Sequence, residues 1–268
     1  MATLSRKPAA TSLPRTAWGW ALGGAVAGVL PALLVFAPAH WLAQGVARAT
    51  AGQVQLLQAR GTVWTGSAQL VLTGGSASQD RAALPGRLDW RIRPHWDGLR
   101  AQVHAACCTP QPLQLRARPR WAGAQLTVLD GDSRWPAAVL TGLGTPWNTV
   151  QPQGQLALQT RGLAAHWSAG RMVLAGQVQL DALAMSSRLS TLRPMGSYRL
   201  ALQGVEVSTL TLSTLAGDLQ LSGTGQWVGQ RLRFTGEASA APEREAALSN
   251  LLNIIGRRSG ARSLITVG

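Results

Sequence analysis

Residues 18–39 constrain what this chain can fold into more than any other stretch. They read WGWALGGAVAGVLPALLVFAPA and carry no charged side chain, whereas Arg15 precedes them and Arg48 follows. A helix of this length rises about 33 Å at about 1.5 Å per residue, which matches the hydrocarbon layer of a bilayer, roughly 30 Å thick. The stretch therefore predicts one transmembrane helix over residues 18–39.

The flanking charges predict which way this helix is oriented. Residues 1–17 contain Arg6, Lys7 and Arg15 and no acidic residue. Because positive flanks stay in the cytoplasm, residues 1–17 are expected to be a cytoplasmic basic tail and residues 46–268 to be exported. Ala37-Pro38-Ala39 has the form of a signal-peptide cleavage site, so a cleaved secretory signal is the alternative. The apolar run is longer than the h-region of about 7–15 residues in a signal peptide, which favours a retained anchor.

The charge balance argues against a nucleic-acid partner. The chain has 25 basic and 11 acidic residues, for a net charge of +14. Lys7 is its only lysine, and the arginines are scattered singly along the sequence. A nucleic-acid-binding protein usually gathers its basic residues on one face or helix. We expect instead a solvated basic surface that attracts anionic lipid or acidic proteins.

After residue 46 the apolar residues recur with the period of a β-strand. Leu88, Trp90 and Ile92 alternate with polar residues, as a half-buried strand requires, and Pro94 is expected to end this strand. The same alternation recurs in segments 113–116, 156–159, 178–181, 198–203 and 231–235. Short alternating segments separated by Gly predict a mainly β domain with an antiparallel, curved sheet. Such a sheet must bury its apolar face by curling, by folding on itself, or against a ligand or partner.

Two further segments do not show the alternating pattern of a strand. Residues 140–154 are rich in turn formers and predict a boundary between two sub-sheets. Near the end, Pro242 and the acids after it predict the start of a short helix that stops at Gly256. Its apolar face is formed by Leu248, Leu251, Leu252 and Ile255. Residues 263–267 are expected to form a final strand.

We find no arrangement of residues that predicts catalysis, a cofactor or a metal. The histidines are His40, His95, His104 and His166. None lies in a metal-binding or hydrolase motif, and the close acidic pair Asp130 and Asp132 is better explained by a turn. We therefore name no catalytic, cofactor-binding or metal-ligating residue and expect a protein that is not an enzyme.

The cysteines and tryptophans leave alternatives open. Cys107 and Cys108 are too few for a structural zinc site; they can pair with each other or with a partner chain, but unpaired thiols are the favoured expectation. Tryptophans in strand-like surroundings are Trp64, Trp90, Trp167 and Trp227. We expect them to pack in the core, with a groove that holds an apolar ligand or partner segment as the alternative.

Several segments in this order resemble one family. They are G-T-V-W-T-G at residues 61–66, Leu88-x-Trp90 with Pro94, and Gly217-Asp-Leu-Gln-Leu followed by Trp227. The chain is similar to type II secretion system protein N, also called general secretion pathway protein N. This resemblance implies a non-enzymatic accessory subunit of the Gram-negative inner membrane, single-pass, with a periplasmic β domain.

The resemblance also implies partners. These are other inner-membrane platform subunits of the type II secretion system and, as a further candidate, the secretin, so that the protein supports export of folded periplasmic proteins across the outer membrane. The alternative function is an envelope protein that binds lipid or another apolar ligand in a β-sheet groove. A continuous apolar trough would favour this alternative.

Overall fold

The computed structural model describes residues 17–75, 78–121, 123–168, 171–204, 208–228 and 231–268. The chain divides into two compact units, Met1–Ala37 and Pro38–Gly268. Nearly all of the predicted cytoplasmic tail, residues 1–17, lies outside the described residues. The two units are therefore described separately below.

The first unit contains helix α1 (Ala17–Val35), which includes Pro31. Its window Trp18–Val35 has a mean hydropathy of 1.7, and none of it is buried, so the helix is long and apolar enough to cross a membrane. It rises about 29 Å at about 1.5 Å per residue. The helix does not continue to residue 39 as predicted, because a proline at position 38 disfavours helical backbone at the residue before it.

A second helix, α2 (Ala39–Ala49), was not predicted from the sequence. It belongs to the second unit and ends at Thr50, whose hydroxyl donates to the Val46 carbonyl at 2.8 Å. Ala39 and Leu42 pack in one cluster with the strand residues Ala68 and Trp90. The helix therefore covers part of the sheet.

The second unit is built on one antiparallel sheet of 16 strands. The strands of its first half are β1 (Val54–Gly61), β2 (Thr65–Thr73), β3 (Arg81–Ala83), β4 (Leu88–His95), β5 (Gly98–Ala105), β6 (Leu113–Arg120), β7 (Gly123–Val128) and β8 (Gly131–Pro136). Those of its second half are β9 (Gln153–Ser168), β10 (Arg171–Ser186), β11 (Gly196–Gly204), β12 (Thr209–Gly217), β13 (Leu219–Val228), β14 (Arg231–Ala240), β15 (Arg257–Ser259) and β16 (Arg262–Val267).

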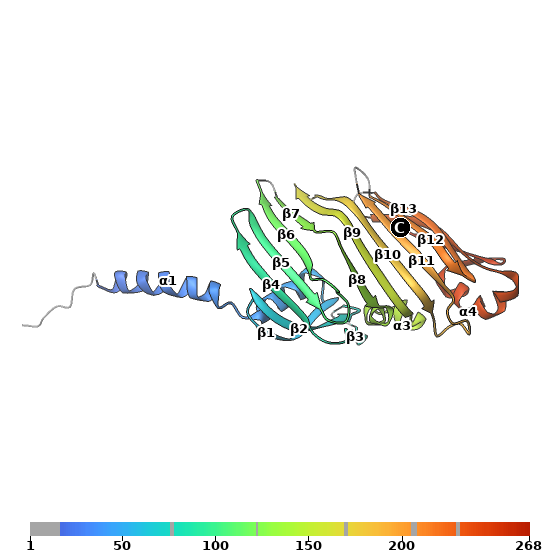
Figure 1. Cartoon of the computed structure of the whole chain (residues 1–268), viewed down its shortest axis with the longest axis horizontal. Coiled ribbons are helices and arrows are strands. Elements are labelled where there is room, and N and C mark those ends of the chain that lie inside the picture. Colours follow the sequence, from blue (N-terminus) through green and yellow to red (C-terminus); the bar gives the residue numbers. More distant parts are fainter. Residues whose placement is uncertain (1–16, 76–77, 122, 169–170, 205–207, 229–230) are drawn as a thin grey trace, which may run out of the picture. The chain divides into compact units, whose positions relative to one another are not determined.

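The sheet is open in the described part of the chain. Its order is β1-β2-β4-β5-β6-β7-β9-β10-β11-β12-β13-β14-β16-β15, with β3 paired to β2 and β8 paired to β9. Figure 1 shows these strands side by side, joined mostly by hairpins whose turns alternate between two edges. The two ends of the sheet, β1 and β15, are therefore its edge strands.

The predicted strands are confirmed: all six alternating segments lie within strands. One detail is corrected, because β4 runs past Pro94 to His95. The backbone N–H of Ile92 donates to the carbonyl of Trp64, toward the β2 side, at 2.6 Å. Two residues further, Pro94 faces the same side, where the pairing with β2 has already ended at Arg91. A proline is tolerated there because no ladder hydrogen bond is lost.

The turn-rich segment 140–154 does not interrupt the sheet. It overlaps a 3-10 helix, η1 (Ala137–Leu143), and a short helix, α3 (Trp147–Val150). Both lie between β8 and β9 in the chain, yet β7 pairs directly with β9. The predicted sub-sheet boundary therefore corresponds to a helical insertion over a continuous ladder.

The C-terminal helix and final strand are confirmed. After the turn η2 (Pro242–Arg244), helix α4 (Glu245–Ile255) buries Leu248, Leu251 and Leu252. These side chains belong to the largest apolar cluster, with Tyr198 and Leu219 of the sheet. Helix α4 therefore covers the same sheet face as α3, and Figure 1 shows both helices near the same edge of the sheet.

Candidate functional site

One face of the sheet is apolar across neighbouring strands. Leu158 lies opposite Leu180, which lies opposite Leu200, and Leu200 lies opposite Leu212. The row continues through Gly223 of β13 and Gly236 of β14 to Ile265 of β16. Because opposite residues project to the same face, strand pairing turns separate alternating segments into one apolar surface.

Glycine is required at one point of this row. A Cβ atom added at Gly223 would come 2.4 Å from the Phe234 ring. The ring therefore lies over the glycine backbone, where no side chain competes for the space. The recurring strand glycines of the sequence serve, at this position, to admit a large ring.

A cavity of about 420 Å³ opens in this apolar surface. Strands β9 to β14 and β16 form its floor, and α3 and α4 supply further walls. Its lining includes Leu180, Leu200, Leu212, Leu221, Ile255 and Ile265. Ligand sites in proteins commonly measure about 300–1,000 Å³ and are mostly apolar, so this cavity has the size and chemistry of one.

Tyr198 lines this cavity, and its hydroxyl is buried against the backbone of Gly196. The residue is 7% exposed, and its hydroxyl is buried without a hydrogen-bond partner among the described residues. Burial, with a smaller contribution from the Asp218 carboxylate, raises the pKa of the phenol far above its usual value. The hydroxyl is therefore a neutral, unpaired donor, an arrangement that buried polar groups rarely show.

The opposite face of the sheet is polar and gathers arginines. Arg93, Arg100 and Arg116 lie directly opposite one another on β4, β5 and β6. Together with Arg91 they line a recess of about 300 Å³. Apart from Arg257 and Arg258, the arginines are scattered singly along the chain, but strand pairing brings these four together. Only the register between the strands brings them together, so no single segment of the sequence indicated the cluster.

The structure brings a serine, an aspartate and a histidine onto three adjacent strands. Ser67, Asp89 and His104 line one recess of about 590 Å³, and Asp89 lies opposite both other residues. In a hydrolase the histidine must contact the serine. Here β4 separates them, and two strand spacings of about 4.8 Å keep their backbones roughly 10 Å apart. Ser67 instead accepts a hydrogen bond from Arg87 at 3.1 Å.

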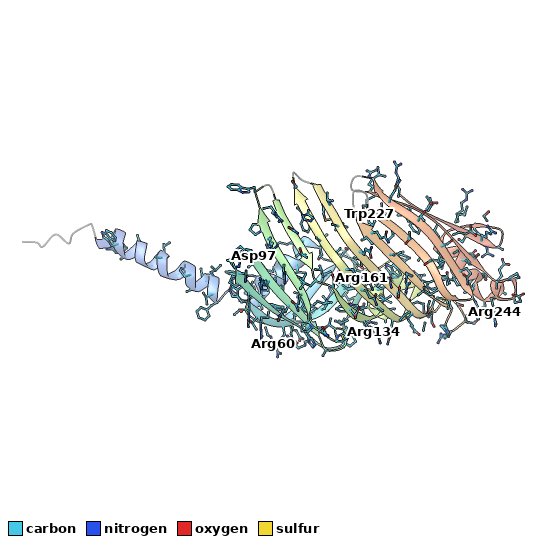
Figure 2. The ribbon with its side chains drawn as sticks, turned by 45° about the horizontal axis from the view of Figure 1, so that its top comes forward. Arg60, Asp97, Arg134, Arg161, Trp227 and Arg244 are labelled. Carbon is cyan, nitrogen blue, oxygen red and sulfur yellow. A yellow bond between two sulfur atoms is a disulfide. The ribbon has the colours of Figure 1, made fainter. Side chains whose placement is uncertain are left out.

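His95 is the histidine with a close acidic partner. Its Nδ1 lies 2.7 Å from Asp97, which also forms an ion pair with Arg118 at 2.5 Å. Desolvation opposes ionisation of Asp97, but the hydrogen bonds from His95 and Arg118 outweigh it and lower the pKa of the carboxyl. Figure 2 labels Asp97 at the β4–β5 turn, so this group ties a hairpin end to β6.

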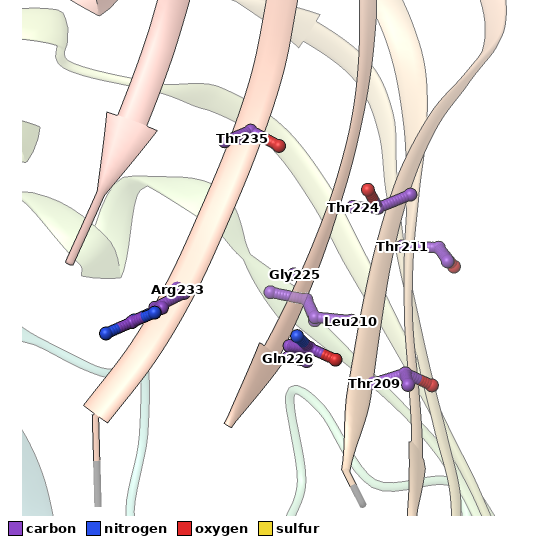
Figure 3. Close-up of a pocket in the computed structure, with 8 residues that line it drawn as sticks. All are labelled: Thr209, Leu210, Thr211, Thr224, Gly225, Gln226, Arg233 and Thr235. Carbon is purple, nitrogen blue, oxygen red and sulfur yellow. The ribbon is translucent and has the colours of Figure 1, made fainter. Parts of the chain in front are cut away.

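Another recess is a polar depression over β12, β13 and β14, about 640 Å³ in volume. Figure 3 shows Thr209 and Thr211 on one side of β12 and Leu210 on the other, with Thr224 and Arg233 among the other lining residues. Hydroxyls and a single arginine provide no acid–base pair. No cluster of three or more His, Cys, Asp or Glu side chains suited to a metal occurs in the part of the chain that the structure describes.

The cysteine expectation is corrected. Cys107 and Cys108 form a disulfide with each other rather than remaining unpaired. They lie between β5 and β6, where Cys108 is 2% exposed and its carbonyl accepts a hydrogen bond from the Arg134 N–H at 2.7 Å. The pair therefore sits in a turn that is tied to β8.

The tryptophan expectation holds for one of the four. Trp90 is buried in the core, whereas Trp64 and Trp227 are half-buried and Trp167 is 41% exposed. Core packing is therefore wrong for Trp167. Trp96 and Trp121 were not singled out from the sequence, yet Trp96 is 90% exposed and Trp121 is fully exposed. Both lie in hairpin turns, between β4 and β5 and between β6 and β7.

In a comparison with known proteins, the chain matches one family. The family model described as type II secretion system (T2SS), protein N matches residues 52–265. This match spans nearly the whole second unit, including the apolar face, its cavity and the arginine cluster. No curated protein and no solved structure matches the chain significantly.

Proposed function

Because this chain belongs to the type II secretion system protein N family, we propose that it is an accessory subunit of the secretion machine, anchored in the inner membrane by α1 with its sheet in the periplasm. Family membership implies a role in type II secretion and partners within the secretion apparatus. The apolar helix and the family together indicate a location in the envelope. The family match over residues 52–265 is the observation that carries this proposal.

We further propose that the protein acts through protein contacts and catalyses no reaction. The family is a structural component of the secretion system. Its proposed partners are the inner-membrane platform subunits and, as a further candidate, the secretin. Support for a contact role comes from the order of the sheet, which ends in two edge strands, β1 and β15.

The edge strand β1 is the better candidate for a strand-accepting contact. It has eight residues, whereas β15 has three, two of them arginines. Short, charged edges resist pairing with other chains, while a longer edge offers main-chain donors and acceptors to a partner strand. Leu57 of β1 is 39% exposed, which adds an apolar contact at this edge.

Photo-crosslinking in cells tests this contact. A photoreactive amino acid at Leu57 should crosslink to secretion-platform subunits, and the same residue at Ser213, which is exposed in the interior of the sheet, should not. Purification of the tagged chain in mild detergent should recover the same subunits. Crosslinks at neither position, with no platform subunit recovered, would contradict the proposal.

A second candidate function is binding of a lipid acyl chain or a similar apolar ligand. The observation that favours it is the cavity of about 420 Å³ with its apolar lining. An engineered apolar cavity of about 150 Å³ already binds benzene, so an elongated apolar ligand suits a larger one.

Two variants at adjacent residues test whether the cavity binds a lipid or has only a structural role. Leu212→Trp fills the cavity, while Ser213→Trp places the same ring on the opposite face of β12. Native mass spectrometry of the purified full chain should detect bound lipid in the wild type and in Ser213→Trp, and much less in Leu212→Trp. An absence of bound lipid from all three proteins would reject this candidate.

A further inference from the structure

The arginine cluster on β4, β5 and β6 carries positive charge that the described residues do not neutralise. Arg93 lies opposite Arg100, and Arg100 lies opposite Arg116. Residues directly opposite have Cβ atoms about 4.5–5.5 Å apart, and like charges in such positions destabilise a sheet. Arg91 adds a fourth guanidinium to the same recess. In the described chain, the ion pairs with carboxylates are formed by other arginines.

Two exposed tryptophans lie at the hairpin ends of the same strands. Trp96 follows β4 and is 90% exposed, and Trp121 follows β6 and is fully exposed. Leu99, at the start of β5, is 44% exposed. Because alternate turns of an antiparallel sheet lie at one edge, the β4–β5 and β6–β7 turns, which carry Trp96 and Trp121, lie at the same edge of the sheet. Figure 1 shows these strands side by side. Indole rings in such positions favour the headgroup zone of a bilayer.

The only acidic side chain in this hairpin end among the described residues is already paired. Asp97 accepts hydrogen bonds from His95 and forms an ion pair with Arg118. Its charge is therefore balanced by these neighbours, and it leaves the arginine cluster without a partner. The hairpin end thus combines exposed aromatic rings with net positive charge.

The distance between the arginine cluster and the exposed tryptophans suits a bilayer surface. Arg93 precedes Trp96 by three residues, which corresponds to about 10 Å along a strand that rises about 3.3 Å per residue. Headgroup layers and interfacial insertion depths are of the same order, about 5–10 Å. Rings inserted at the tip would therefore hold the guanidinium groups near the level of lipid phosphates, which arginine binds well.

We propose that this edge of the sheet docks on the surface of an anionic lipid bilayer, with Trp96 and Trp121 in the interface and Arg93, Arg100 and Arg116 on phosphate groups. An acidic protein segment would satisfy the arginines but would give no role to two tryptophans that project from the tips. The chain also carries a helix long enough to cross a membrane, so it works where such surfaces are available. This docking does not depend on the secretion partners.

Vesicle flotation with the full chain tests the proposal. The protein is reconstituted through its apolar helix into phosphatidylcholine nanodiscs and mixed with vesicles of phosphatidylcholine alone or with phosphatidylglycerol added. The wild type should float with the phosphatidylglycerol vesicles and not with the others, and salt should weaken its binding. Binding that is equal for both vesicle types, or absent from both, would overturn the proposal.

Two triple variants that each remove three arginines provide a matched comparison. The triple variant Arg93→Gln, Arg100→Gln, Arg116→Gln should lose binding by on the order of 100-fold, since each arginine near an anionic surface contributes about fivefold. The control Arg81→Gln, Arg188→Gln, Arg193→Gln removes equal charge from exposed arginines elsewhere and should bind almost as the wild type does. Equal losses in both triple variants would show that only net charge matters and would reject the site.

Variants of the two tryptophans distinguish a bilayer from any other anionic partner. Trp96→Ala with Trp121→Ala should also reduce flotation by tenfold or more, while Trp147→Ala, in α3, should not. Because Trp96 and Trp121 are exposed, circular dichroism should confirm that the variants stay folded. Binding that survives loss of both rings but not of the arginines would indicate a non-inserting anionic partner and contradict bilayer docking.

Discussion

The Trp90 side chain joins the β1–β2 turn to the core of the sheet. Its indole nitrogen donates to the carbonyls of Thr62 and Val63 at 3.2 and 3.1 Å, and the residue is 4% exposed. Trp90→Ala should lower the free energy of unfolding by about 3–5 kcal/mol, because it removes a large buried ring. Trp90→Phe should cost less, since it loses mainly the hydrogen bonds.

Chemical denaturation of the detergent-solubilised chain measures both changes. Trp121→Ala is the control, because that side chain is fully exposed and its loss should change the free energy of unfolding by less than about 0.5 kcal/mol. If Trp90→Ala and Trp121→Ala destabilised the protein equally, the assignment of Trp90 to the core would be wrong.

The Asp181–Arg199 pair makes stability depend on pH. Arg199 donates through Nε and Nη2 to the two carboxylate oxygens of Asp181, both at 2.8 Å. These hydrogen bonds lower the pKa of Asp181 despite some desolvation. A lowered pKa adds stability that is present above the unfolded pKa of about 3.9 and is lost as the pH falls through the folded value.

Asp181→Asn should therefore destabilise the protein at pH 7 by roughly 0.5–1 kcal/mol, a modest value because Arg199 is 40% exposed. The difference from the wild type should shrink as the pH falls below about 4. Thermal unfolding of both proteins across this range measures it. A difference that stayed constant into strong acid would show that the ion pair is not its source.

At the residue scale, the sequence did not indicate that Ser67, Asp89 and His104 lie on neighbouring strands, because only strand pairing brings them together. The arginine cluster could not be recognised from separate residues, because only the register between β4, β5 and β6 brings its members together. Non-local pairing of this kind leaves no local signal.

Helix α4 stabilises the C-terminal strands through buried leucines. Leu252 is fully buried, and its carbonyl accepts a hydrogen bond from the Ser263 hydroxyl of β16 at 2.7 Å. Leu252→Ala should lower the free energy of unfolding by about 2–5 kcal/mol. The neighbouring Asn253→Ala, on the exposed side of the helix, should change it little. Denaturant titrations of the two variants compare them, and equal effects would refute the packing role of α4.

The spacing of the apolar residues predicted strands and helices reliably. The segments that neighbour each of them in the sequence did not help in the same way. Alternation predicted the strands, and the spacing of the apolar residues predicted α4. Helix α2 was not predicted because it follows the apolar run almost directly, so its own amphipathic pattern merged with that of α1. The boundary predicted near residues 140–154 reflected real turns and short helices, but the turn residues carried no information about which strands pair across them.

On the scale of the whole molecule, the two faces of one open sheet have different chemistry. The apolar face carries α2, α3, α4 and the cavity, while the polar face carries the arginine cluster. The sequence allowed the fold class and the family to be predicted, because both depend on local alternation and ordered motifs. It left open whether the sheet closes, since closure depends on pairing between β1 and the last strands, which are far apart in the chain.

We propose that α1 anchors this sheet on the outer side of the inner membrane. Alkaline phosphatase fused after Gly268 tests this location directly in cells, because this enzyme becomes active only after export. The fusion at Gly268 should be active, and a fusion after Arg15 should be inactive. An inactive C-terminal fusion, together with a cytoplasmic reporter that is active at the same position, would contradict it.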